Sequence, residues 1–121
     1  MIQEFRKKIN ECDALILCTP EYAFEIPGVL KNALDWLVSS GNLLDKPVAI
    51  LSASTSKMGA GKANKLLSEL VKVLMGNVHE NTNLKISSVN KKFDEHSKLI
   101  DHELKSKLKN LLRELEGEGN K

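Results

Sequence analysis

The residues best suited to binding a ligand follow two short apolar runs of the sequence. The first segment is Thr19–Pro27 and the second is Ser52–Gly61. Pro20 and Pro27 restrict the backbone of the first segment, whereas Gly59 near the end of the second lets the chain approach a flat ligand closely. Backbone N–H and C=O groups in such loops suit an aromatic heterocycle with alternating donors and acceptors. Reactive side chains are then hardly required.

Other residue types that often carry chemistry give weak signals. The stretch Gly59-Ala60-Gly61-Lys62 lacks the earlier glycine, and the Ser or Thr after the lysine, that a phosphate-binding loop requires. The three histidines show no metal-ligand spacing with carboxylates or cysteines. Cys12 and Cys18 are too few for a disulfide framework and form no Cys-x-x-Cys motif. We therefore expect two reduced, buried thiols with a structural role.

The periodicity of apolar residues predicts the elements that hold these loops. Apolar residues at helical spacing predict four helices, at residues 2–12, 29–38, 66–75 and 104–115. Continuous apolar runs predict two strands covered on both faces, at residues 14–18 and 47–51. Between residues 77 and 89, Val78-His79 and Leu84-Lys85-Ile86 compete as a third strand. Asp101 is the expected N-cap of the last helix.

The alternation of strands with helices predicts an α/β fold. Right-handed crossovers would give a doubly wound parallel sheet of about three strands with helices on both faces. In such a sheet, ligands bind beyond the carboxyl ends of the strands. The two loop segments would both lie at that edge.

Length and charge limit the remaining classes of function. The chain has 121 residues, 41% of them apolar, which matches one ordinary domain with a real core. Its 18 basic and 16 acidic residues are scattered and give a formal net charge of +2. We therefore expect neither a nucleic-acid partner nor a membrane partner, because no basic tract or apolar stretch of membrane-spanning length is present. The expected location is cytoplasmic.

Longer motifs give the resemblance to a family. The first is Pro20-Glu21-Tyr22 followed by Ile26-Pro27-Gly28-Val29-Leu30-Lys31-Asn32-Ala33-Leu34-Asp35-Trp36. Next come Lys46-Pro47-Val48-Ala49-Ile50-Leu51-Ser52-Ala53-Ser54 with Gly59-Ala60-Gly61, and then Lys92-Phe93-Asp94-Glu95. In this order they resemble the NAD(P)H-dependent FMN reductase family, which has a flavodoxin-like fold and includes chromate, quinone and azo-dye reductases.

The resemblance implies a flavin oxidoreductase. Hydride would pass from NAD(P)H to FMN and on to a flavin, quinone or similar acceptor, so flavin and nicotinamide nucleotides would be the ligands. The residues that it places at the cofactor are Pro20, Glu21, Tyr22, Ala23, Ser52, Ser54, Gly59 and Gly61. Relatives usually carry Asn where this chain has Ala23. No catalytic acid–base residue is implied.

The family pattern also opens with a strand and a Gly-Ser-x-Arg-x-x-Ser loop that holds the FMN phosphate. Residues 1–115 correspond to the C-terminal two-thirds of such a domain, and 116–121 are an expected frayed tail. The first strand would then have an open, apolar edge, which predicts a homo-oligomer that covers it. The alternative function is a truncated flavodoxin-like chain without FMN or activity, acting as an oligomerising or partner-binding module.

Several single residues allow two interpretations. Trp36 lies at helical spacing from Val29, which favours packing or a subunit contact over stacking on a ligand. Tyr22 has little reason to join the core, and a binding role is favoured there. Glu21 and Lys57 are each either solvated loop residues or contacts to a nucleotide.

Overall fold

Three parallel strands in the order β1-β2-β3 form the sheet in the computed structural model of the chain. The structure describes residues 1–21 and 26–119. In chain order, the elements are α1 (Ile2–Glu11), β1 (Leu15–Thr19), α2 (Gly28–Asp35), β2 (Val48–Ala53), α3 (Gly61–Val73), the 3-10 turn η1 (Glu80–Thr82), β3 (Asn83–Ile86), the 3-10 turn η2 (Val89–Lys91) and α4 (His102–Gly119). The predicted α/β class with about three strands is confirmed.

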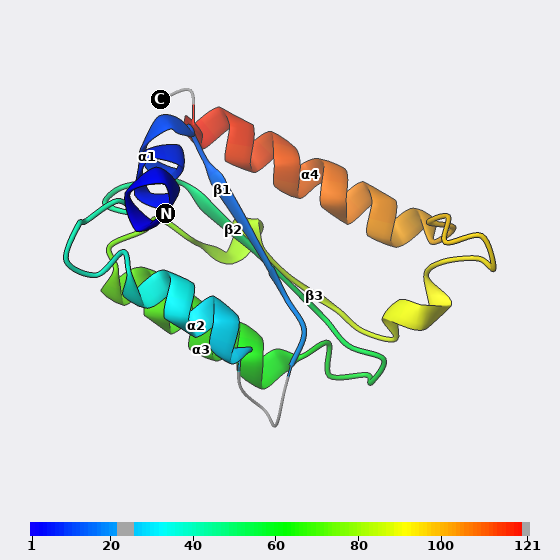
Figure 1. Ribbon diagram of the computed structural model, residues 1–121. Helices are drawn as coiled ribbons and strands as arrows, with labels where there is room; N and C mark the ends of the chain where they lie inside the picture. The colour runs from blue at the N-terminus through cyan, green and yellow to red at the C-terminus, as the bar shows by residue number, and fades with distance from the viewer. Residues whose placement is uncertain (22–25, 120–121) are drawn as a thin grey trace.

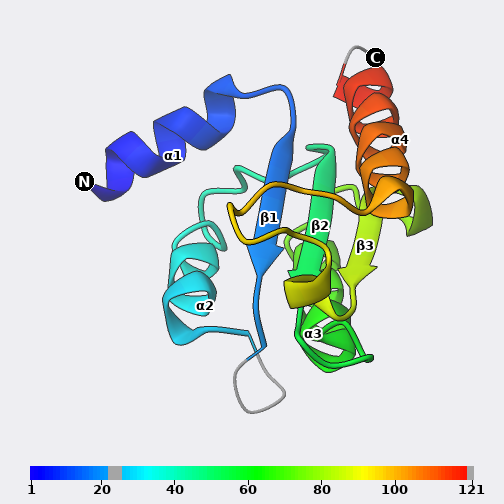
Figure 2. The same cartoon turned by 90° about the vertical axis from the view of Figure 1, so that its right-hand side faces the viewer.

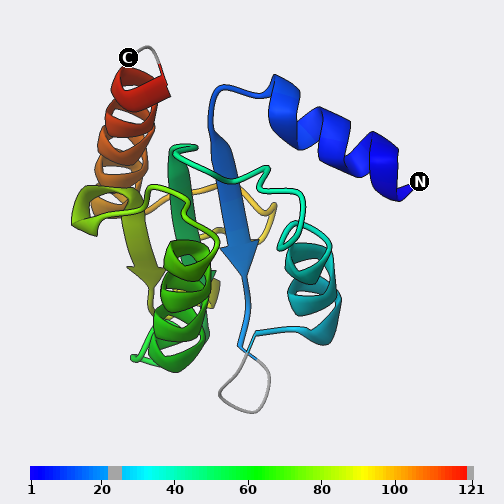
Figure 3. The same ribbon diagram turned by 90° about the vertical axis from the view of Figure 1, so that its left-hand side faces the viewer.

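Helices cover both faces of the sheet (Figure 1). α4 lies on one face beside β3, and the segment that leads into it runs across that face in front of β1 and β2 (Figure 2). α2 and α3 lie toward the opposite side (Figure 3). Among the described residues, no helix is both long and apolar enough to cross a membrane.

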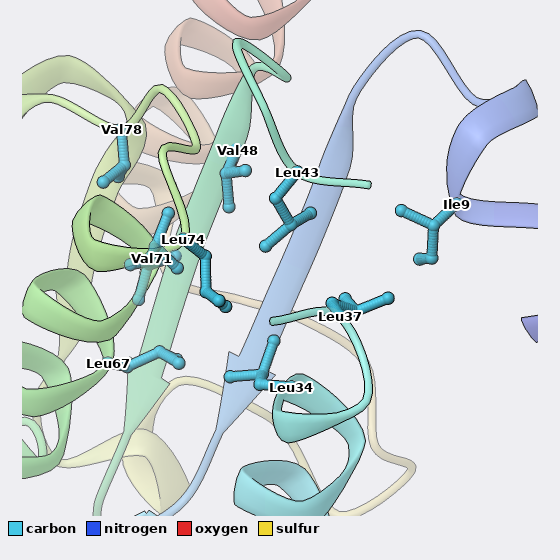
Figure 4. Packing of buried hydrophobic residues seen from close by; sticks show 10 residues of the cluster. Ile9, Leu34, Leu37, Leu43, Val48, Leu67, Val71, Leu74 and Val78 are labelled. Atoms are coloured by element: carbon cyan, nitrogen blue, oxygen red, sulfur yellow. The ribbon is translucent and has the colours of Figure 1, made fainter. Parts of the chain in front are cut away.

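The main hydrophobic core fills the space between the sheet and the pair α2 and α3 (Figure 4). Leu67, Val71 and Leu74 recur every three or four residues, so one stripe of α3 faces the sheet. The buried residues of this core are Ile9, Leu34, Leu37, Leu43, Val48, Ile50, Leu67, Val71, Leu74 and Val78. Two of them come from β2, whose alternate residues turn to this face.

The opposite face of the sheet is only partly covered. Ala49 of β2 packs there with Leu111 and Leu115 of α4. On the edge strand β1, however, Ile16 is 45% exposed and Cys18 is also exposed. The prediction that β1 is covered on both faces and that both cysteines are buried is therefore wrong, because α4 packs over the other two strands (Figure 2).

α1 is attached to the rest of the fold mainly through its carboxyl end. The Lys46 ammonium donates to the carbonyl oxygens of Ile9 and Cys12, at 2.7 and 2.6 Å. These carbonyls lie at the helix terminus, where no intrahelical partner exists. A second contact comes from Arg6, which donates through Nη2 to the carbonyl oxygen of Trp36, just after α2, at 2.7 Å.

Several predicted boundaries differ from the structure. β2 continues through Ala53, so Ser52 belongs to the strand and not to the loop. α2 ends at Asp35, and the buried Leu37 lies in the turns that follow. Of the two candidate third strands, the residues around Leu84 form β3, because they pair with β2.

α4 continues further than expected, and residues 120–121 of the expected frayed tail lie outside the described residues. α4 runs through Gly119, so residues 116–119 continue the helix instead of fraying. The Glu118 carboxylate pairs with the His79 ring, which ties the last turn of the helix to the turn before β3. Tertiary contact thus extends a helix end that local sequence, with two glycines, disfavours.

The N-cap of α4 is the expected one. Asp101 Oδ1 accepts a hydrogen bond from the backbone N–H of Leu104 at 2.8 Å, and Lys92 lies 3.4 Å from its other oxygen. The Leu104 hydrogen bond and the Lys92 charge together hold the pKa of Asp101 below its usual value of 3.8.

This cap predicts a pH-dependent share of the stability. Because the pKa of Asp101 is lower in the folded chain, the carboxylate stabilises the fold above its unfolded pKa, and this stabilisation is lost as the pH falls through the folded value. Asp101→Asn keeps a neutral cap. Between pH 7 and pH 3, roughly the range in which carboxylates titrate, we expect the urea midpoint of the wild type to fall more than that of the variant. Parallel curves would contradict the assignment.

Candidate functional site

The carboxyl ends of the three strands bring three loops to one edge of the sheet. β1, β2 and β3 end at Thr19, Ala53 and Ile86, at the lower end of the sheet in Figure 2. In a parallel sheet with helices on both faces, this edge is where ligands bind. Both loop segments singled out in the sequence begin here, as expected.

Glu21 joins the first loop to the start of α3. Its Oε1 accepts a hydrogen bond from the backbone N–H of Ala63 at 3.2 Å. Ala63 is in the first turn of the helix, where N–H groups lack intrahelical partners and the helix dipole favours a negative charge. The carboxylate is half-buried. Glu21 therefore caps α3 and holds the β1 loop against the start of that helix.

The buried side chain of Ser52 holds the second loop in place through two hydrogen bonds. Its hydroxyl donates to the carbonyl oxygen of Gly59 at 2.8 Å and accepts from the Asn64 amide at 2.9 Å. Ser52 and Asn64 are 0% and 1% exposed. Sequence reasoning missed Asn64, although a polar residue in the apolar stripe of α3 with Leu67 and Val71 is a recognisable signal.

Gly59 is required by both its backbone and its surroundings. Its φ is +59°, a left-handed conformation that favours glycine. A Cβ there would lie 3.1 Å from Lys85 Cβ and 3.2 Å from the backbone of Ile86 and Ser87. The loop after β2 thus packs directly on the end of β3. The next residue, Ala60, also has a positive φ of +59° and is fully buried.

The segment after β3 supports the same loop, and no residue pattern predicted this contact. Ser54 N–H donates to the carbonyl of Ile86 at 3.0 Å, and its own carbonyl accepts from Val89 N–H at 2.9 Å. Ser88 N–H donates to the carbonyl of Ser56 at 2.8 Å. Ser54 Oγ in turn accepts from Ser56 N–H at 3.0 Å. The loop is held on two sides before any ligand binds.

The structure therefore brings most of the expected residues to one edge of the sheet, but at different depths below the surface. Pro20 is exposed, and Ser54 and Gly61 are half-buried, so these three reach the surface of the edge. Ser52 and Gly59 are buried below it. The other two expected positions, Tyr22 and Ala23, lie outside the described residues.

This edge suits a flat heterocycle. Its loops offer small side chains, serine hydroxyls and backbone groups held in place by the contacts above, which fits the alternating donors and acceptors of a flavin ring. The residues present thus fit FMN as a ligand of the three-loop edge. Lys57 is exposed on the same loop.

Fold and site together define a flavodoxin-like α/β protein with a loop-built edge for a cofactor. A family model described as NADPH-dependent FMN reductase matches residues 1–91, which include β1, β2 and both loops. The chain belongs to this NADPH-dependent FMN reductase family.

Named relatives agree with the family. An NAD(P)H-dependent FMN reductase of Pseudomonas aeruginosa is 32% identical over 117 residues, which cover 95% of this chain and 63% of that protein. An NADPH:quinone oxidoreductase of Arabidopsis thaliana is 32% identical over 119 residues, covering 96% of this chain and 60% of that protein. The chain thus spans about three-fifths of the length of these relatives.

A solved structure confirms the fold. The chain resembles FerB, a flavoenzyme NAD(P)H:(acceptor) oxidoreductase from Paracoccus denitrificans, with a TM-score of 0.73 and 24% sequence identity. The similarity covers 98% of this chain and 65% of that one.

Two glycine substitutions test the loop geometry. Gly59→Ala would place a Cβ against β3 in a left-handed conformation, so we expect a loss of about 1 to 3 kcal/mol in the free energy of unfolding. Gly61→Ala is the matched control, because nothing lies within 4 Å of its Cβ and the residue is helical. We expect it to be neutral or slightly stabilising. Equal urea midpoints for both variants would contradict the packing of this loop.

Proposed function

We propose that the chain contributes the ring-binding wall of a flavin site in an NAD(P)H-dependent oxidoreductase. When bound, FMN would supply the hydride chemistry between NAD(P)H and a flavin, quinone or similar acceptor. Residues 1–115 would form one flavodoxin-like unit. We also propose a cytoplasmic location, consistent with two free cysteines.

The observation that carries this proposal is the contact between the first loop of the family match and the start of α3, which directly follows the second loop. The Glu21 carboxylate on the first loop accepts a hydrogen bond at 3.2 Å from Ala63 N–H, in the first turn of the helix that follows the second loop. The contact fixes the relative position of two backbone segments that would line opposite parts of a planar ring. Pre-positioned loops lower the entropy cost of ordering a binding site.

The residues would have two kinds of role. Pro20 and Ser54 at the surface would contact the ring, together with Tyr22 and Ala23 of the same first loop. Buried beneath them, Ser52 and Gly59 would position the second loop, and Gly61 would start α3 beside it. Hydrogen bonds from such loops orient the ring and exclude water from one of its faces.

Flavin binding is the direct test. We expect the purified chain to quench FMN fluorescence with a saturable curve, and Glu21→Ala to weaken binding about tenfold, which corresponds to roughly 1.4 kcal/mol. The reason is that the variant releases the first loop from α3. Glu116→Ala, an exposed carboxylate on α4, is the control and should bind FMN like the wild type.

A colourless chain that leaves FMN fluorescence unchanged at high concentration would reject the proposal. That result would favour the alternative, a flavodoxin-like module without flavin.

We further propose that the chain is a homo-oligomer whose copies meet at β1. β1 is an edge strand of the three-stranded sheet in the described part of the chain, and its Ile16 and Cys18 are exposed on one face. Unpaired backbone groups beside apolar side chains favour pairing with another strand. A second copy offers the same edge.

Light scattering tests this interface. We expect the wild type to have the mass of a dimer or larger species, and Ile16→Lys to shift it toward the monomer, because an edge lysine opposes strand pairing. Leu112→Lys is the control, since Leu112 is 50% exposed but lies on α4, beside β3 and away from β1. A monomeric wild type at high concentration would remove the proposal.

A further inference from the structure

A groove lies between α3 and the open edge of β3. Lys65, Lys72 and Glu69 line it from the helix, and Asn83 and Lys85 line it from the strand. The groove reaches the loop after β2 at Met58. It therefore begins at the three-loop edge and continues along the side of the molecule.

Positive charge dominates this groove. Lys65 and Lys72 lie seven residues apart on one face of α3, which separates them by about 10 Å along the helix axis. Within residues 1–21 and 26–119, no carboxylate forms an ion pair with Lys65, Lys72 or Lys85. Glu69 is the single acidic residue among the lining residues. The lysines thus produce a field that attracts an anion.

Asn83, one of the residues that line the groove, also has a polar atom that lacks a partner. The amide oxygen of Asn83 is buried and accepts no hydrogen bond from the described residues. Such groups are uncommon in native proteins, since losing a partner on burial is costly. A ligand with hydroxyl or amino donors would supply what this oxygen lacks, after a small rotation of the side chain.

The place of the groove narrows the class of ligand. The end of the groove at Met58 shares the loop after β2 with the proposed flavin site, and α3 extends about 16 Å from Gly61 to Lys72. A ligand that reacts at the flavin site and also carries phosphates on an extended arm could reach the lysines. Dinucleotides have this form, and their adenosine end carries hydroxyl and amino donors.

We propose that this groove binds the phosphorylated adenosine portion of NADPH, with Lys65, Lys72 and Lys85 contacting the phosphates. The identity of the nucleotide rests on the proposed function, whereas the affinity for a phosphorylated adenosine does not. The 2′-phosphate adds two negative charges near neutral pH, so the groove favours NADPH over NADH.

The test uses the chain alone, without flavin. In calorimetric titrations we expect 2′,5′-ADP to bind saturably and more tightly than 5′-AMP. Lys65→Gln and Lys85→Gln should each weaken the affinity for 2′,5′-ADP about tenfold, because each removes a charge-assisted contact. Lys109→Gln, on the exposed side of α4 and outside the groove, should leave it unchanged. Unfolding midpoints of all variants should match the wild type, since these lysines are exposed.

Three results would overturn the inference. The first is the absence of saturable 2′,5′-ADP binding, and the second is an equal loss of affinity in Lys109→Gln. Binding of poly-glutamate that 2′,5′-ADP does not displace would also overturn it, in favour of a docking surface for an acidic protein. The FMN titration separates this inference from the proposed function. FMN binding without 2′,5′-ADP binding would reject only the proposed role of the groove, and the reverse result would reject only the proposed flavin site.

Discussion

The position of the whole loop edge depends on one buried chain of hydrogen bonds, from the Asn64 amide through the Ser52 hydroxyl to the Gly59 carbonyl. It links the carboxyl end of the central strand β2 to the first turn of α3 across the loop between them. A different loop path would leave a buried hydroxyl or amide without a partner, which costs about 1 to 3 kcal/mol. The same three residues therefore position the start of α3, the N–H group that Glu21 caps, and the end of the groove between α3 and β3.

The strands of the sheet are not equally covered by helices, and the uncovered parts of the sheet form distinct surfaces. β2 is buried on both faces, between the main core and α4. β1 shares only the main core, and the exposed Ile16 and Cys18 lie on its other face. Each edge strand presents different chemistry, since β1 offers apolar side chains and β3 offers Lys85 beside α3. A sheet of this kind has an apolar edge and a basic edge.

Features set by local interactions could be predicted from the sequence. The apolar stripes of α3 and α4 and the Asp101 cap depend on neighbours within a few residues, and all three are present. Features set by distant contacts could not. A continuous apolar run such as 15–18 does not reveal which of its faces is covered, and only pairing with β2 decides between the two candidate third strands. The buried role of Ser52 depends on Asn64, twelve residues later, and the extension of α4 depends on His79.

The three carbonyls that Lys46 holds at the end of α1 have a consequence for the order of folding. The carbonyl oxygens of Ile9, Asn10 and Cys12 accept hydrogen bonds from Lys46, a residue more than thirty positions later in the chain. During synthesis, α1 leaves the ribosome before the charge that terminates it exists. An isolated ten-residue helix is marginal in water. The stability of α1 thus depends on a charge that the chain supplies only with the residues just before β2.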